Sequence, residues 1–153
     1  MQTVTCRPPL LAQSQPRGQQ PDRITMPHTP LISHLHHVSL LVSDLEASRR
    51  FYEGVLELSP SDARPNFDFD GIWYDLGAQQ IHLMVLPNPD QGTERPRHGG
   101  RDRHVALAVA DWEKLLARLA RAGIPHTTSR SGRRAVFCRD PDGNAVELIG
   151  PAP

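Results

Sequence analysis

The chain contains an internal repeat that predicts one structural unit used twice. The segment HVSLLVSDLE at residues 37–46 returns as HVALAVADWE at residues 104–113, an offset of 104 minus 37, or 67 residues. Six of the ten positions are identical between the two segments. Each segment has the apolar alternation of a half-buried strand and then an Asp before an amphipathic run, which is typical of a strand leading into a helix.

Each copy predicts a strand, a helix and three further strands. Asp44 and Asp111 are the expected helix N-caps, and the helices are predicted over DLEASRRFYEGVLE and DWEKLLARLARAG, the second of which ends at Gly123. Strand candidates then follow near Glu57, at GIWYDLG and QQIHLMVL, and in the second copy at IPHTTS, RAVFCRD and NAVELIG. We therefore expect an α+β fold in which two βαβββ modules form a cup-shaped mixed sheet with the helices on its outer face.

Strand parity brings four polar side chains to the face opposite the helices. In residues 37–42 the apolar side chains alternate, so His37 points away from the helix. The same parity places His82, His104 and Glu147 on that face. Three imidazoles and a carboxylate suit one divalent ion per site, such as Zn, Ni, Mn, Co or Fe(II). Four ligands on an octahedral ion leave two positions open, as catalysis requires.

The sequence around these residues resembles the vicinal oxygen chelate superfamily, which includes glyoxalase I, fosfomycin-resistance proteins, extradiol dioxygenases and bleomycin-binding proteins. The motifs that carry the resemblance are LHHVSLLVSDLEASRRFYEGVLEL, QQIHLMVLPNPD, RDRHVALAVAD and AVFCRDPDGNAVELIGP. The resemblance implies that His37, His82, His104 and Glu147 are the metal ligands. It also implies that the metal binds two neighbouring oxygens of a substrate.

The resemblance implies a metal-dependent lyase or isomerase of the glyoxalase type that acts on a small, oxygen-rich metabolite. Glu147 or His82 would move a proton during that reaction. An Fe(II) dioxygenase of the extradiol type is an alternative, because His37, His104 and Glu147 match its two-histidine, one-carboxylate ligand set. A second alternative is a non-catalytic protein that binds an antibiotic or another small molecule in the same cup.

Three further residues are candidates for substrate binding. Arg101 and Arg103 come just before His104, where guanidinium groups could clamp a carboxylate or phosphate, so an anionic substrate is expected. Tyr74 alternates with Trp73 in GIWYDLG, so one of the two side chains should face the cavity, and we take it to be Tyr74.

Each module supplies only two of the four ligands, His37 with His82 or His104 with Glu147. A complete site therefore needs two modules side by side. Since relatives of this size typically dimerise, we expect a homodimer whose site combines the first module of one chain with the second module of the other. A cup closed within one chain is the alternative.

Composition argues against several other classes of protein. The 17 basic and 17 acidic residues give a formal net charge of zero and no electrostatic reason to expect nucleic acid or a membrane as partner. Cys6 and Cys138 form no disulfide or zinc-ligand spacing, so a cytoplasmic location is expected. Residues 1–31 are rich in Pro and Gln and predict a disordered leader before a domain at 32–151, with modules at about 32–87 and 101–151.

Overall fold

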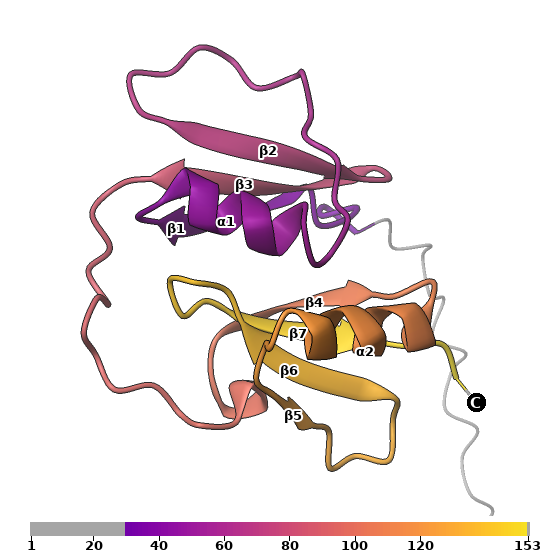
Figure 1. Ribbon diagram of the computed structural model, residues 1–153. Coiled ribbons are helices and arrows are strands. Elements are labelled where there is room, and N and C mark those ends of the chain that lie inside the picture. Colours follow the sequence, from indigo (N-terminus) through magenta and orange to yellow (C-terminus); the bar gives the residue numbers. More distant parts are fainter. Residues whose placement is uncertain (1–29, 153) are drawn as a thin grey trace, which may run out of the picture. The chain divides into compact units, whose positions relative to one another are not determined.

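The two copies of the repeat form two structural units of the same design in the computed structural model, which describes residues 30–152 (Figure 1). We call them module 1, from β1 to β3, and module 2, from β4 to β7. Their elements are β1 (His37–Val42), α1 (Leu45–Tyr52), β2 (Gly71–Leu76), β3 (Gln79–Val85), η1 (Gly99–Arg101), β4 (His104–Ala108), α2 (Trp112–Arg121), β5 (His126–Thr128), β6 (Ala135–Arg139) and β7 (Ala145–Ile149).

Each module has its own small mixed sheet. Module 1 has the strand order β1-β3-β2, and module 2 has the order β4-β7-β6-β5. In both modules the first strand runs parallel to the last strand, whereas the remaining neighbours are antiparallel. The predicted α+β class with mixed sheets is confirmed, and the strands are divided between two sheets.

The strand predicted near Glu57 is wrong. Residues 53–70, all of which the structure describes, contain no strand. Glu57 has a φ of 58°, in the left-handed region that strands do not use. Pro60 has no N–H to donate and forms only an isolated antiparallel bridge with Tyr74. Module 1 is therefore βαββ, whereas module 2 has the predicted βαβββ order.

Both helices begin at the aspartates that the repeat predicts. The side chain of Asp44 accepts a hydrogen bond from the N–H of Ala47 at 3.0 Å, and Asp111 accepts one from Lys114 at the same distance. Because these bonds satisfy N–H groups that have no partner within the helix, they fix where each helix starts. Helix α2 ends before Gly123, whose φ of 63° suits glycine.

Replacing the cap of α2 should lower the stability of the protein measurably. We expect Asp111→Ala to reduce the free energy of unfolding by about 1 kcal/mol, because the N–H of Lys114 loses its acceptor. Asp111→Asn keeps an acceptor oxygen and should lie within a few tenths of a kcal/mol of the wild type. Urea unfolding followed by circular dichroism measures both, and equal losses for the two variants would contradict the capping role.

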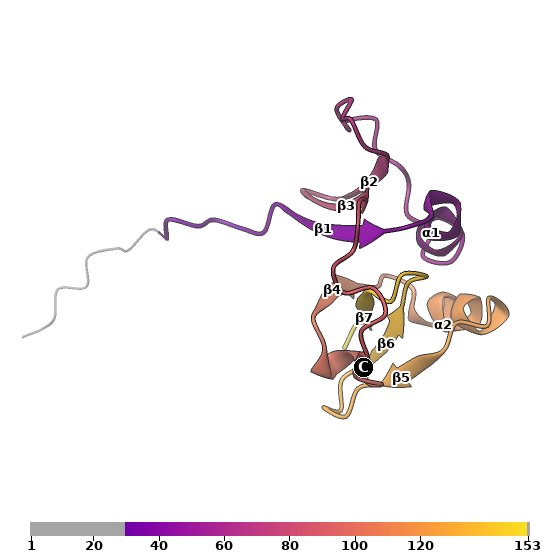
Figure 2. The same ribbon diagram turned by 90° about the vertical axis from the view of Figure 1, so that its left-hand side faces the viewer.

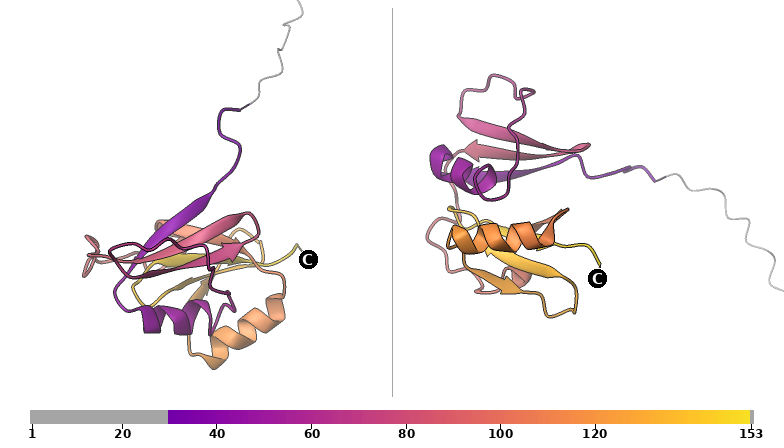
Figure 3. Two further views of the ribbon diagram at one scale, coloured as in Figure 1. Left: turned by 90° about the horizontal axis from the view of Figure 1, so that it is seen from above. Right: turned by 45° about the vertical axis from the view of Figure 1, so that its right-hand side comes forward.

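One hydrophobic core joins the two modules on the helix side of the sheets. Figures 2 and 3 show α1 and α2 on the same side of the two sheets. The core draws on both modules, and its most deeply buried side chains include Val42, Tyr52, Ile81, Leu83, Leu119 and Val146. The strand faces opposite the helices are therefore left for polar side chains.

Buried hydrogen bonds add to this core where the modules meet. Tyr52 Oη donates to Asp140 Oδ2 at 2.9 Å, and Asn144 Nδ2 donates to the same oxygen at 2.8 Å and to the carbonyl of Leu41 at 3.0 Å. The carboxyl group of Asp140 also accepts from the backbone N–H groups of Asp142 and Asn144. Tyr52 and Leu41 belong to module 1 and the others to module 2, so this network, the Asp140 network, ties the modules together.

The leader predicted at residues 1–31 lies outside the described residues except for its last two positions. Within residues 30–152, no helix has the length and apolar character needed to cross a membrane. From residue 34 onward the chain forms one compact unit.

Candidate metal centre in two halves

Strand register places the four predicted ligands in two equivalent pairs. In module 1, Ser39 of β1 lies opposite His82 of β3. In module 2, Ala106 of β4 lies opposite Glu147 of β7. His37 lies two residues before Ser39, so it is the diagonal neighbour of His82 on the same face. In the same way, His104 lies two residues before Ala106 and is the diagonal neighbour of Glu147. The parity that the repeat predicts is confirmed in both modules.

The module 1 pair is held in a stack of three rings. The rings of His37 and His82 are stacked with centroids 4.2 Å apart, and Trp73 covers the other face of His82 at 3.8 Å. His82 Nε2 donates to Gln80 Oε1 at 2.9 Å. The amide of Gln80 is oriented by its own bond to Asp75 Oδ1, at 2.7 Å, because a carboxylate only accepts. His82 is thus fixed by ring contacts and by a hydrogen bond.

The surroundings of His82 favour its neutral form. Its side chain is buried, and burial lowers the pKa of the imidazole. Charge on His37 and His36 lowers that pKa further. Since a histidine must be neutral to bind a metal ion, this environment suits a ligand.

The module 2 pair has the spacing of two ligands of one ion. His104 Nε2 lies 3.2 Å from Glu147 Oε2, and His104 Nδ1 lies 2.8 Å from the carbonyl of Asp102. The carbonyl only accepts, so Nδ1 carries the proton and Nε2 faces the carboxylate. Two atoms that bind one ion at 2.0–2.2 Å lie roughly 3.0–3.4 Å apart, depending on the coordination geometry. The observed distance falls in that range.

Glu147 also has a buried oxygen without a partner. Its side chain is 7% exposed, and Oε1 is buried with no hydrogen-bond partner among residues 30–152. The nearest cation, Arg133 Nη2, lies 3.8 Å away and is largely exposed. A buried carboxylate oxygen without a donor calls for an explanation, and a metal ion supplies one. The residues of module 2 therefore fit the divalent ion that the resemblance implies.

A single chain does not bring the two pairs together. Among residues 30–152, no three His, Cys, Asp or Glu side chains lie close enough to hold one ion. The structure thus joins His37 to His82 and His104 to Glu147, but it does not join one pair to the other.

Asp102 anchors the loop that carries His104. Arg95 binds its carboxylate through two hydrogen bonds, at 2.8 and 2.9 Å, and Arg139 Nη1 lies 2.9 Å from Oδ2. The N–H of Arg103 donates to the same carboxylate. These groups favour the ionised form of Asp102, and the hydrogen bond from Arg95 has the largest effect. Together they lower the pKa of Asp102 to about 2. The backbone carbonyl of Asp102 accepts the hydrogen bond from Nδ1 of His104.

The contribution of Asp102 to stability should vanish in acid. The folded state lowers its pKa from 3.8 to about 2, so its contribution is fully present above pH 3.8 and is lost as the pH falls to about 2. We expect Asp102→Asn to unfold at lower urea concentration than the wild type at pH 6, and the gap to close by pH 2. Urea titrations across this range measure the gap, and a gap that stays constant would contradict the ion-pair role.

The structure corrects the placement of Tyr74. Its side chain is fully buried in the core, and its hydroxyl donates to Glu53 Oε1 at 3.0 Å. Strand register explains this, since Tyr74 pairs with Ile81 of the core whereas Trp73 pairs with His82. Trp73, which sequence reasoning did not choose, is the aromatic residue of the ligand face. The pairing of β2 with β3 was the missing signal.

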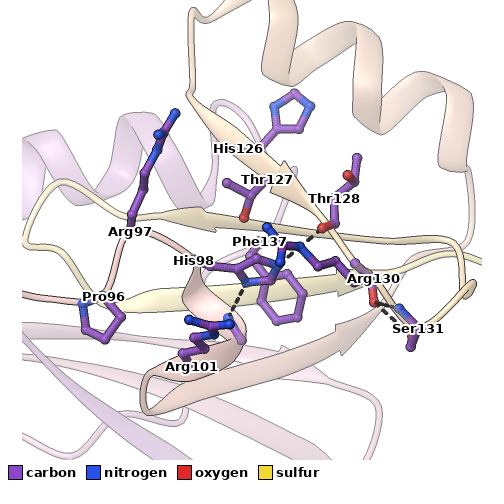
Figure 4. A pocket seen from close by; sticks show the side chains of 12 residues that line it. Pro96, Arg97, His98, Arg101, His126, Thr127, Thr128, Arg130, Ser131 and Phe137 are labelled. Atoms are coloured by element: carbon purple, nitrogen blue, oxygen red, sulfur yellow. Dashed lines mark hydrogen bonds between the residues drawn. The ribbon is translucent and has the colours of Figure 1, made fainter.

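The two predicted arginines lie in different surroundings. Arg103 is exposed, and its guanidinium forms an ion pair with Asp90. Arg101 lines a cavity of about 960 Å³ together with Arg97, Arg130 and Phe137 (Figure 4). Arg97 belongs to the same arginine-rich loop but was passed over because Arg101 and Arg103 lie nearer to His104 in the sequence. Arg130 was not predicted, because it lies in a distant loop with no motif of its own.

The paired ligands, the repeated modules and their mixed sheets agree with a comparison across known families. Residues 34–148 match the family model of the Glyoxalase/Bleomycin resistance protein/Dioxygenase superfamily. The chain belongs to this superfamily.

Individual relatives support the same assignment. The chain is 25% identical to glyoxylase I 4 of Arabidopsis thaliana, over 76% of this chain and 70% of that protein. It is 30% identical to the glutathione transferase FosA of Serratia marcescens, over 77% of this chain and 81% of that protein. The crystal structure of the fosfomycin resistance protein FosX from Mesorhizobium loti has the same fold, with a TM-score of 0.57 at 24% identity, covering 78% of this chain and 92% of that one.

Proposed function

We propose that this protein is a metal-dependent lyase or isomerase of the glyoxalase type that acts on a small, oxygen-rich, anionic metabolite. The observation that carries the proposal is the His104–Glu147 pair, whose donor atoms lie 3.2 Å apart, with a buried carboxylate oxygen that lacks a hydrogen-bond donor. Relatives with lyase and transferase activity in their names are consistent with an enzyme.

The proposed active form is a homodimer with two equivalent sites. Each site takes His37 and His82 from one chain and His104 and Glu147 from the other. Two facts support this arrangement: each module holds its two ligands on one face, and residues 30–152 of a single chain hold no group of three. Two-fold symmetry then generates the second site.

The residues of the site have separate roles in the proposed reaction. A bound Zn, Ni, Mn, Co or Fe(II) ion supplies Lewis acidity to two neighbouring substrate oxygens. Glu147 accepts or returns the proton at its carboxylate, and His82 is the second candidate for that transfer. Trp73 and His37 cover the two faces of the His82 ring, and Gln80 accepts the hydrogen bond from its Nε2, so the ring is kept in place.

A second candidate function is an Fe(II) dioxygenase of the extradiol type. One observation favours it: His82 Nε2 already donates to Gln80, and both of its ring faces are covered. His82 would then act as an acid or base beside the metal, and His37, His104 and Glu147 would be the ligands.

Partners and location belong to the same proposal. The partner is a small molecule, and neither nucleic acid nor a membrane is expected from a chain with zero formal net charge. A cytoplasmic location fits Cys138, a buried free thiol whose pKa burial raises to about 12.

Metal binding tests the proposal directly. Protein stripped with a chelator and reconstituted with each ion should bind about one ion per chain, measured by atomic emission after gel filtration. The double variant His37→Ala, His104→Ala should bind none, and Glu147→Gln should lose at least about tenfold in affinity. Glu46→Gln, which alters an exposed carboxylate of α1, should bind as the wild type does. Equal binding by wild type and double variant would overturn the metal-enzyme proposal.

A substrate panel separates the candidate reactions. The reconstituted protein is incubated with 2-oxoaldehydes plus thiols, with fosfomycin plus thiols, and with catechols in air, and products are identified by mass spectrometry. An isomerised thiol adduct supports the glyoxalase-type reaction, whereas ring-opened catechol supports the dioxygenase. Tight binding of a compound that is always recovered unchanged would identify a binding protein instead.

A further inference from the structure

Module 2 contains a cavity lined by residues of a loop and a hairpin. It has a volume of about 960 Å³ and lies between the segment that leads into η1 and the hairpin of β5 and β6. Figure 4 shows Arg101, His98 and Arg130 around the ring of Phe137. The volume exceeds that of a single small anion, so a larger molecule could enter.

The lining of this cavity carries positive charge from the guanidinium groups of Arg97, Arg101 and Arg130, and no carboxylate is among its lining residues. The imidazoles of His98 and His126 also line it. Hydroxyl groups from Thr128, Ser129 and Ser131 add hydrogen-bond donors. We call the cavity that these eight residues and Phe137 line the cationic cavity.

Its arginines differ from the other arginines nearby. Arg95 and Arg139 are both bound to the carboxylate of Asp102. No hydrogen bond or ion pair of the side chains of Arg97, Arg101 or Arg130 is found within residues 30–152. Like charges gathered without a counter-charge repel each other and raise the local concentration of anions. The cluster therefore attracts anions from outside the chain.

Two glycines allow η1 to lie close to the side chain of Phe137. A Cβ atom on Gly99 or Gly100 would lie 3.0 Å from that side chain, so any other residue would push η1 away from it. The ring of Phe137 lies 4.9 Å from His98 and 5.5 Å from His104. Phe137 is also the cross-strand partner of Glu147. One side chain thus borders both the cationic cavity and the module 2 ligand pair.

We propose that the cationic cavity binds the phosphate group of a phosphorylated substrate, whose reacting oxygens extend past Phe137 toward Glu147. Planar guanidinium groups match phosphate oxygens in pairs, and several of them favour a doubly charged phosphate over a single carboxylate. The direction toward Glu147 rests on the proposed function, whereas phosphate binding itself requires no metal.

The test uses the full-length, metal-free protein, because phosphate could otherwise ligate the metal. Isothermal titration calorimetry with inorganic phosphate, and separately with succinate at the same ionic strength, measures both affinities. Phosphate should bind more tightly than succinate, and Arg101→Gln and Arg130→Gln should each weaken phosphate binding about tenfold or more. Arg121→Gln, an exposed arginine of α2 outside the cavity, is the matched control and should bind as the wild type does.

The outcomes distinguish this proposal from the proposed metal site. Circular dichroism confirms that each variant is folded, and ion stoichiometry is measured on the same preparations. Unchanged phosphate affinity in both cavity variants, or tighter binding of succinate than of phosphate, would overturn the phosphate assignment. If the wild type binds phosphate but no metal ion, the metal-dependent function is contradicted and the phosphate assignment is supported.

Discussion

A mixture of His37→Ala and Glu147→Ala chains should regain metal binding that neither variant has alone. In a homodimer with shared sites, each mixed dimer has one site that carries both substitutions and one site that carries neither. Random exchange makes half of the dimers mixed, so about a quarter of the wild-type sites should return. Ion content after unfolding and refolding the two chains together measures the recovery, and any activity from the substrate panel should return in the same proportion.

The matched control combines two substitutions within one module. A mixture of His37→Ala and His82→Ala chains leaves every site of every dimer with a damaged module 1, so no recovery is expected. Subunit exchange is verified with differently tagged chains. If exchange is complete and the first mixture recovers nothing, each chain builds its own site and the shared arrangement is wrong.

Replacing Asp140 with alanine should produce the largest loss of stability. The carboxyl group of Asp140 accepts from Tyr52, from the side chain of Asn144 and from the N–H groups of Asp142 and Asn144. Burial raises the pKa of Asp140, so its charge opposes folding and these donors offset that cost. Because Asp140→Ala leaves several buried donors without an acceptor, we expect the free energy of unfolding to fall by about 3 kcal/mol or more.

Two milder substitutions test whether the network itself is responsible. Tyr52→Phe removes one donor and keeps the ring in the core, so a loss of about 1 kcal/mol is expected. Asp68→Ala removes an exposed carboxylate and should change stability by less than about 0.5 kcal/mol. Urea unfolding measures all three. A loss for Asp140→Ala no larger than that for Tyr52→Phe would show that the network contributes little.

The repeat was sufficient to predict most of the fold, because its information is local. Asp44 and Asp111 cap the helices that follow them, and alternation along a strand determines which side chains share a face. His37, His82, His104 and Glu147 therefore lie on the predicted face. The prediction of a strand near Glu57 was wrong because one residue with positive φ interrupts the extended backbone. Strand propensity does not indicate such a residue.

Features that depend on register or on distant loops could not be predicted. Tyr74 and Trp73 are neighbours in the sequence, and only the pairing of β2 with β3 decides which of them reaches His82. The cationic cavity needs the loop before η1 and the β5–β6 hairpin to approach each other in space. Arg101 was named as a candidate because it comes shortly before His104, a predicted ligand, whereas Arg130 lies in a loop with no motif of its own.

The two modules hold different groups at corresponding positions, an imidazole at His82 and a carboxylate at Glu147. A duplicated unit that had kept identical ligands would give a centre with its own two-fold axis, and a chelated molecule could then enter in either of two equivalent orientations. One carboxylate among three imidazoles removes that equivalence. In the proposed site, the two ends of a substrate would meet sides of different charge, and the carboxylate would stand on one side alone. The difference at a single register position would thus fix which end of the substrate lies nearest a base.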